Sequence, residues 1–311
     1  MSVSPVRQTH WDWRAVGNWV GGGTGSGIMI LAALLALMGI DSYFTVLLSC
    51  VFIMAGLFSV LMKIGRPLRA LYVFRNPFTS WMAREAYVAV LLLPSGLAAF
   101  WFHSPALLLL SALFAFGYLY CQAYILKDCR GIPAWRIDEV VPLIITMALV
   151  EGAGIILLSG PFIPPLQRYF LSPEIQLSSL AKEISSPDLL VTAWILLVAR
   201  VITWQRYYSA LKENSPVATI EQLRQVNRPY LMFGNLLPVL LLFTPWLLNE
   251  FITVPLVVAG LCMLLSGWWV KFIIVARAGY DQGFALPHSP ARGAGKPGPG
   301  VKPGWPENNN F

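Results

Sequence analysis

One acidic residue lies inside a long apolar stretch, where a charge is costly. Glu151 occurs in PLIITMALVEGAGIILL, about 13 residues after Asp138, the expected start of that stretch. A helix would place it roughly 20 Å deep, where a carboxylate must be paired, protonated or facing water. Either Glu151 hydrogen-bonds inside a helix bundle, or it belongs to a proton path. Arg200 lies deep in a later stretch, from which it can snorkel to the interface or pair with an internal acid.

A second group of polar residues lies at the ends of the apolar stretches. Its members are Trp13 and Asn18 in the first stretch, Lys63 and Arg66 after the second, Arg84 and Glu85 at the start of the third, and Tyr124 near the end of the fourth. The aromatic members can be ordinary interface anchors, because Trp and Tyr belts mark any membrane interface. The segment PLRALYVF has the apolar rhythm of an interfacial amphipathic segment. Its basic groups can anchor lipid headgroups or pair with an acidic partner.

The cysteines and histidines restrict the metal chemistry that the chain can support. Cys50, Cys121, Cys129 and Cys262 show no C-x-x-C spacing, so we expect no iron–sulfur cluster in this chain. The three histidines do not form the pair within helices that a transmembrane b-type haem usually needs, so we expect no haem. There is also no Walker loop and no HExxH motif.

The elements that position these side chains must be membrane-spanning helices. The chain has 311 residues, 57% hydrophobic and 12% charged, which is about half the charged fraction of a soluble domain. Several windows reach the roughly 20 apolar residues that cross a bilayer, and helices satisfy their own backbone groups in lipid. We expect an all-α integral membrane protein with eight transmembrane helices. They lie near residues 14–38, 43–62, 82–102, 105–126, 138–159, 188–208, 230–249 and 252–276.

Two further segments differ from this pattern. Residues 1–278 form the expected membrane domain, whereas residues 279–311 form a Pro- and Gly-rich tail without an apolar period. Alone such a tail is flexible or extended, and on a partner's surface it can order as a strap. The glycine-rich segment GGGTGSG at 21–27 follows no strand. It therefore favours close helix packing over direct contact with a ligand.

The basic residues predict the orientation of the helices. With eight crossings, both termini lie on the same face of the membrane as the segments between helices 2 and 3, 4 and 5, and 6 and 7. Of the 22 Lys and Arg residues, Arg168 and Lys182 fall on the other face, which leaves 20 on this one. The positive-inside rule then predicts that both termini are cytoplasmic. The net charge of +7 thus reflects topology and attraction to membrane lipid, and we expect no nucleic-acid partner.

Three motifs can be compared with a known family. WDWRAVGNWVGGGTGSG opens the first helix, GRPLRALYVFRNPFTSWMAREA joins the second and third, and YLYCQAYILKDCRGIPAWR leaves the fourth. Together they resemble segments of the NrfD-like membrane anchors, a family that includes the membrane subunits of DMSO reductase and polysulfide reductase. The resemblance covers residues 10 to about 160, and the second half matches only in helix count and polarity.

The resemblance implies an anchor in a bacterial or archaeal cytoplasmic (inner) membrane. Such an anchor is not catalytic by itself and carries no redox cofactor. It binds ubiquinone or menaquinone and exchanges electrons with an iron–sulfur subunit that has four cubane clusters. That subunit joins a molybdopterin catalytic subunit, which holds molybdenum or tungsten. The cytosolic basic face implies a cytosolic catalytic module, suited to a substrate such as a coenzyme A thioester; phenylacetyl-CoA:acceptor oxidoreductases are relatives of this kind.

The resemblance also assigns roles to residues at the cytosolic ends of the first four helices. The quinone-binding set is Trp13, Asn18, Lys63, Arg66, Arg84, Glu85 and Tyr124, and Glu85 is the nearest candidate acid. The expected proton path contains Glu85 together with Glu151, whose place in it rests on its depth in the fifth apolar stretch. The docking set for the iron–sulfur subunit is Arg66, Arg69, Arg75, Arg130 and Arg136. Lys63 stands where the DMSO reductase anchors commonly have a His that is linked to quinol. Proton handling then falls to Glu85, a Tyr or water.

Two other functions stay open. An eight-helix solute or proton transporter would show a midplane site on broken helices and often internal repeats, whereas here polar residues cluster at one end. A structural anchor without quinone chemistry would bind partner subunits and no quinone.

Overall fold

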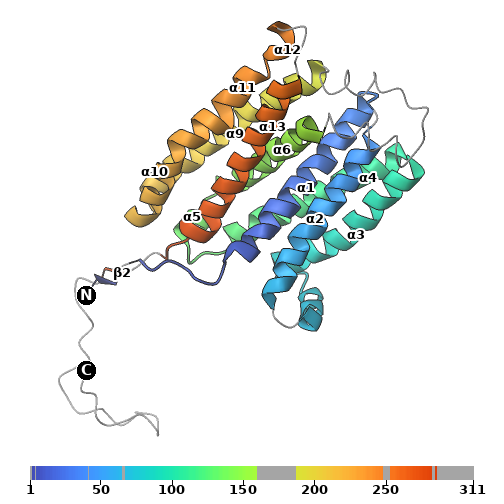
Figure 1. The fold of residues 1–311 in the computed structure, drawn as a ribbon. Helices are drawn as coiled ribbons and strands as arrows, with labels where there is room; N and C mark the ends of the chain where they lie inside the picture. The colour runs from blue at the N-terminus through green and yellow to red at the C-terminus, as the bar shows by residue number, and fades with distance from the viewer. Residues whose placement is uncertain are drawn as a thin grey trace, which may run out of the picture.

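The computed structural model describes residues 2–3, 5–40, 42–64, 67–159, 187–247, 253–281 and 284–285. Within these ranges, eight helical segments are long and apolar enough to cross a membrane (Figure 1). The first six are α1 (Trp13–Leu37), α2 (Tyr43–Ile64), α3 (Trp81–Phe102), α4 (Pro105–Lys127), α6 (Val140–Ser159) and α9 (Pro187–Asn214). The prediction of an all-helical protein with eight long apolar helices is confirmed, and the chain is a multi-pass helical membrane protein.

The last two spans are not regular α-helices throughout. The seventh span consists of α10 (Val217–Leu231), the π-helical turn η2 (Met232–Leu236), α11 (Leu237–Leu241) and α12 (Thr244–Leu247). The eighth span consists of α13 (Thr253–Phe272) and the π-helical turn η3 (Ile273–Arg277). Such wide turns occur often at functional sites in helices.

The seventh helix begins at Val217, so the expected start near residue 230 is wrong. The segment VATIEQLRQVNRP is polar, and Pro229 disfavours helical backbone in the residue before it. The helix nevertheless runs through Pro229, because Leu223, Val226 and Tyr230 form a buried stripe that packs into the bundle. Tertiary packing therefore outweighs the local proline penalty.

Short elements close the end of the bundle at which α1 begins and η3 ends, which we call the basic end. The segment between α2 and α3, expected to be interfacial, forms the 3-10 helix η1 (Pro67–Arg75), and the segment after α4 contains α5 (Pro133–Arg136). The strands β1 (Ser2–Val3) and β2 (Phe284–Ala285) pair antiparallel, which holds the first residues of the chain against the beginning of the expected tail.

The helices pack in two halves that meet along α1 and α6. In the first half α1 contacts α2 and α4, and α3 packs on α4; in the second half α6 contacts α9 and α13. A Cβ atom on Gly27 would lie 2.0 Å from the carbonyl oxygen of Ala148, and one on Gly152 would lie 2.4 Å from the carbonyl carbon of Gly27. The expectation that residues 21–27 serve close helix packing is confirmed.

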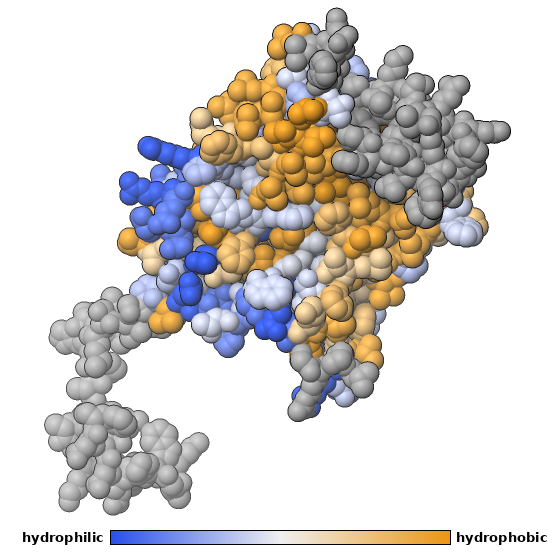
Figure 2. Space-filling model, viewed as in Figure 1, coloured by the Kyte–Doolittle hydropathy of each residue, from blue (hydrophilic) through white to orange (hydrophobic). Residues whose placement is uncertain are grey.

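The surface of the bundle separates by polarity along its length. Apolar side chains cover much of the sides of the helices, and hydrophilic side chains gather toward the basic end (Figure 2). Exposed Phe58, Trp101 and Leu113 illustrate the apolar sides. A soluble protein seldom exposes such a surface, whereas lipid solvates it.

Candidate functional site

Four buried polar residues from three helices form a cluster near the basic end. In this Glu85 cluster, Asn18 donates from Nδ2 to Glu85 Oε1 at 2.8 Å, and the Tyr118 hydroxyl donates to Asn18 Oδ1 at 3.0 Å. Gln122 Nε2 donates to the backbone oxygen of Asn18 at 2.8 Å. The structure thus brings together Asn18 and Glu85, both in the expected quinone set, and adds two residues from α4.

Local sequence explains why these side chains can meet. Glu85 is four residues after Trp81, the first residue of α3, so it lies roughly 6 Å inside the helix. Tyr118 and Gln122 are four residues apart and therefore share one face of α4. A Cβ atom on Gly22 of α1 would lie 2.5 Å from Gln122 Nε2 and 2.7 Å from the Tyr118 ring. The lack of a side chain at Gly22 therefore lets Gln122 reach the backbone oxygen of Asn18 and lets Tyr118 reach the Asn18 side chain.

The other expected quinone residues lie outside the hydrogen bonds of this cluster. Arg84 donates to the backbone oxygens of Pro77 at 2.9 Å and Phe78 at 2.6 Å, and its guanidinium lies 4.2 Å from the ring centre of Trp81. It therefore braces the turn before α3. Tyr124 is half-buried, with its ring 4.6 Å from that of Trp81.

Three members of the expected set remain. Trp13 is 64% exposed, as suits an interface anchor. Lys63 is half-buried and donates from Nζ to the backbone oxygen of His10. This contact ties the end of α2 to the segment before α1. Arg66 lies outside the described residues.

A second cluster lies deeper in the bundle, around Glu151. Glu151 Oε2 lies 2.7 Å from Lys271 Nζ and accepts from the Thr24 hydroxyl at 2.7 Å. Trp268 Nε1 donates to Thr24 Oγ1 at 2.9 Å, and Lys271 Nζ also donates to the backbone oxygen of Trp19 at 3.0 Å. Both charged side chains are fully buried, so this Glu151 cluster is an ion pair within the protein.

The sequence allowed two roles for Glu151, hydrogen bonding inside the bundle or a proton path. The structure shows the hydrogen bonding. The proton path stays a prediction. The partner Lys271 was missed because it lies near the end of the last helix, where a lysine usually serves topology. The sequence feature that could have identified Lys271 was its position among apolar residues in WWVKF. Gly267, one turn before Lys271, makes room for the acid, since its Cβ would lie 2.4 Å from Glu151 Oε1.

Arg200 is a third fully buried charge, so of the two alternatives for this residue, snorkelling to the interface is wrong, and Arg200 forms no salt bridge with a described acid. Its Nε donates to Asn235 Oδ1 at 2.9 Å, and its Nη1 donates to the backbone oxygen of Met263 at 3.1 Å. Its Nη2 donates to the backbone oxygen of Gly234 in η2. Asn235 and Gly234 belong to the π-helical turn, so Arg200 stabilises the irregular part of the seventh span from within.

The two clusters approach each other across α1. A Cβ atom on Gly23 would have both Lys271 Nζ and Gln122 Oε1 within 4 Å. Gln122 Oε1 and Glu151 Oε1 are buried and have no hydrogen-bond partner among the described residues. Buried acceptors of this kind call for water or a ligand. Gly23 therefore lies between the two clusters, and its lack of a side chain lets Lys271 Nζ come close to the α1 backbone.

The expected docking arginines lie at the surface of the basic end. Arg69 and Arg75 are exposed on η1, and Arg130 and Arg136 are exposed around α5. Arg75 lies 4.7 Å from the ring centre of Tyr72, and Arg136 donates to the backbone oxygen of Arg130 at 3.3 Å. The segments that contain η1 and α5 thus present positive charge at the same end of the bundle as the Glu85 cluster.

No model of a known protein family matches the chain, and a comparison with curated proteins finds no match.

Proposed function

We propose that the chain is the quinone-reactive membrane anchor of a molybdenum or tungsten oxidoreductase complex. In this role it holds an iron–sulfur subunit and a molybdopterin subunit on its basic end and exchanges electrons with the former. The basic end then faces the cytosol, because the sequence assigns 20 of its 22 Lys and Arg residues to this face, and the bias remains strong without the buried Arg200 and Lys271. The proposal rests on the resemblance of three motifs to the NrfD-like anchors. The arrangement of polar residues at the basic end of this chain supports it.

The Glu85 cluster is the observation that carries the proposal. It offers an amide, a carboxyl group and a phenol within one buried network. Glu85 lies roughly 6 Å inside the start of α3, at the same end of the bundle as the exposed arginines of η1 and of the segment around α5. A quinone must accept electrons from a docked cluster, so it needs a site near the docking face. The unpartnered Gln122 Oε1 gives the site hydrogen-bonding capacity that the described residues do not use.

The chemistry requires hydrogen-bond donors and protons from the protein. A bound quinone supplies the two-electron, two-proton couple. Asn18 Nδ2 and the Tyr118 hydroxyl are donors that can turn from their present partners to a quinone oxygen. Glu85 is the acid of the site and can transfer a proton over hydrogen-bond distance. Lys63, which now donates to the backbone oxygen of His10, would have to turn from that partner to stabilise negative charge that develops on the quinone.

The test separates quinone chemistry from catalysis in the partner subunit. Quinone turnover and artificial-dye reduction are measured for the intact complex carrying Asn18→Ala, Lys63→Ala or Glu85→Gln. We expect quinone turnover to fall by about 100-fold in Glu85→Gln, as for loss of a general acid, with dye reduction unchanged. Tyr87→Phe is the matched control, because Tyr87 is exposed on α3 and its hydroxyl donates to the backbone oxygen of Phe74, away from the cluster. Normal quinone turnover in all three site variants would refute the proposed pocket.

Docking at the basic end has its own test. The double change Arg69→Glu and Arg136→Glu reverses one charge in each exposed link. We expect the iron–sulfur subunit to dissociate more readily, and more so at higher salt, because exposed charges are screened. An intact complex in this variant would mean that these links contact lipid headgroups instead.

A solute or proton transporter is the second candidate, and the buried charges favour it. Glu151 and Lys271 pair inside the bundle, and Arg200 bonds to an irregular turn of the seventh span. Transporters place sites of this kind on interrupted helices. The chain alone, reconstituted in vesicles, would then carry protons down an imposed gradient, and Glu151→Gln would stop the flux. A chain that carries no protons but supports quinone turnover in the complex would leave the anchor as the function.

A further inference from the structure

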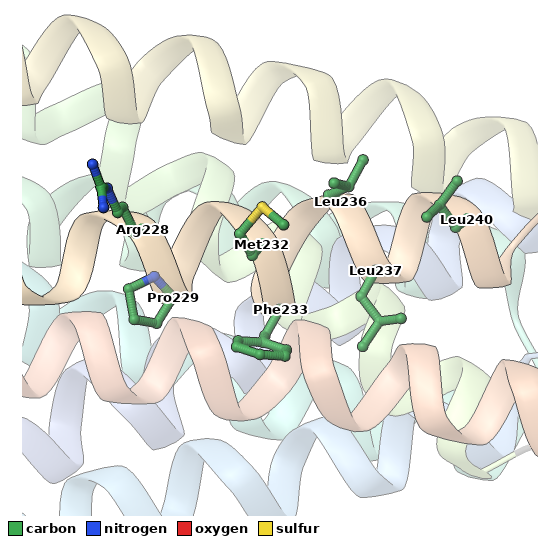
Figure 3. Close-up of a pocket in the computed structure, with 7 residues that line it drawn as sticks. All are labelled: Arg228, Pro229, Met232, Phe233, Leu236, Leu237 and Leu240. Atoms are coloured by element: carbon green, nitrogen blue, oxygen red, sulfur yellow. The ribbon is translucent and has the colours of Figure 1, made fainter.

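An apolar groove runs along the outer side of the seventh span. Its volume is about 410 Å³, and its lining consists of Arg228 at one end and six apolar residues from Pro229 to Leu240. Figure 3 shows side chains spaced by four residues following one another along the helix, from Arg228 through Met232 and Leu236 to Leu240. The three apolar members of this row are about half exposed.

The length of the span fixes the depth of the groove in the membrane. The span Val217–Leu247 has 31 residues, or about 46 Å of helix, against about 30 Å of hydrocarbon. The excess lies at its start, because residues 217–228 hold charged and amide side chains, whereas residues 229–247 hold no charged one. Arg228 therefore stands at the membrane interface, and the groove leads from it into the apolar layer.

The dimensions and charge of the groove match one kind of occupant. Twelve residues separate Arg228 from Leu240, which corresponds to roughly 18 Å of helix, close to the thickness of one leaflet. Arg228 is exposed and forms no salt bridge with a described residue. Arg224, one helical turn earlier on the same face, adds a second exposed positive charge. A guanidinium group binds phosphate oxygens with two parallel hydrogen bonds.

We propose that this groove binds an anionic phospholipid from the leaflet at the basic end. The lipid phosphate lies on Arg228, and one acyl chain lies along Met232, Leu236 and Leu240. The π-helical turn η2 departs from regular α-helix within the groove, so a flexible acyl chain fills the uneven surface better than a rigid helix would. The site lies on the second half of the bundle and does not depend on the proposed quinone chemistry.

The experiment uses the full chain, purified in detergent. Phosphatidylglycerol and phosphatidylethanolamine with identical acyl chains are titrated in, and bound lipids are counted by native mass spectrometry. We expect one phosphatidylglycerol to bind about fivefold more tightly than phosphatidylethanolamine. This is the gain in affinity for an anionic lipid that one basic residue near a membrane surface contributes. Arg228→Gln should reduce this preference to nearly equal binding. Leu236→Trp, which fills the groove, should weaken both lipids.

The matched control is Arg130→Gln. Arg130 is also exposed at the basic end, but it lies between α4 and α5 rather than in the groove, so its loss should leave the preference unchanged. Circular dichroism checks that the variants keep their helical content. Equal binding of the two lipids by the unchanged chain, or the same loss of preference in Arg130→Gln, would overturn the proposal. Ubiquinone-8 provides a further check. If it displaces the bound lipid equally well from the unchanged chain and from Arg228→Gln, the groove is a quinone site and the proposal is overturned.

Discussion

The two buried acids of this bundle are held in opposite ways. Glu85 accepts from the neutral amide of Asn18 and forms no salt bridge with a described residue. Glu151 is paired with Lys271 at 2.7 Å, and both side chains are fully buried. One lies close to the basic end, and the other lies about 11 residues, or roughly 16 Å, inside α6.

This difference separates a site that can respond to a ligand from one that holds the fold. An ion pair in a dry interior satisfies both charges, and removal of one partner leaves the other uncompensated. A carboxyl group among amides and phenols can gain or lose a proton without breaking a pair. We therefore expect the Glu151 cluster to govern stability and the Glu85 cluster to govern chemistry. The predictions below test this contrast and the helix contact on which both clusters depend.

The largest effect is expected from breaking the ion pair. Lys271→Met removes the cation and keeps the apolar length of the side chain, so Glu151 is left buried without its ion-pair partner. We expect the free energy of unfolding to fall by about 3–5 kcal/mol. Unfolding of the purified chain by sodium dodecyl sulfate, followed by circular dichroism, measures this change.

The double variant Glu151→Gln with Lys271→Met is the control for that measurement. It removes both charges, and the new glutamine side chain would keep an oxygen that can accept from Thr24. We expect it to be clearly more stable than Lys271→Met alone, because no lone charge remains. A double variant as unstable as the single one would show that packing of the lysine chain, rather than its charge, stabilises the bundle.

The second effect concerns the contact between the two halves, on which both clusters depend. In Gly27→Ala the new methyl group would lie 2.0 Å from the Ala148 carbonyl oxygen, so α1 and α6 must separate. We expect a loss of about 3 kcal/mol in the free energy of unfolding, at the upper end for overpacking. Gly117→Ala is the matched control, because its methyl group would meet Val88 at an ordinary 3.7 Å. It should be neutral or stabilise by up to about 1 kcal/mol; equal losses in both variants would rule out the close contact as the cause.

Much of this architecture follows from the sequence. Runs of about 20 apolar residues fix the number of spans, because the bilayer demands that length. The start of α10 did not follow, since its polar residues and Pro229 hide a stripe that only tertiary packing reveals. In the site, Glu85 and Asn18 were identified because they are polar residues at apolar helix ends. Their partners Tyr118 and Gln122, and the pairing of Glu151 with Lys271, depend on which helix faces meet. That information lies in the packing of distant segments and has no local pattern.

A smaller effect is expected at Arg84, the neighbour of Glu85. Arg84 bonds to the backbone oxygens of Pro77 and Phe78 and covers the Trp81 ring, so it points to the turn rather than into the cluster. Arg84→Met should lower the free energy of unfolding by about 1–2 kcal/mol through loss of these contacts. Quinone turnover per intact complex should stay within about twofold of the unchanged complex, which corresponds to a change of roughly 0.4 kcal/mol or less in the activation free energy. A large rise in the KM for quinone in this variant would instead assign Arg84 to the pocket.

The smallest effect on stability is expected at Glu85 itself. In Glu85→Gln the new amide oxygen can still accept from Asn18 Nδ2, and no ion pair is lost, so the free energy of unfolding should change by less than about 1 kcal/mol. Glu85→Ala, by contrast, leaves that donor without its partner and should cost about 1–3 kcal/mol. Sodium dodecyl sulfate unfolding of the two variants beside Lys271→Met gives all three values under one condition. A loss in Glu85→Gln as large as that in Lys271→Met would mean that the Glu85 charge supports the fold, and the division between a responsive acid and a structural acid would be wrong.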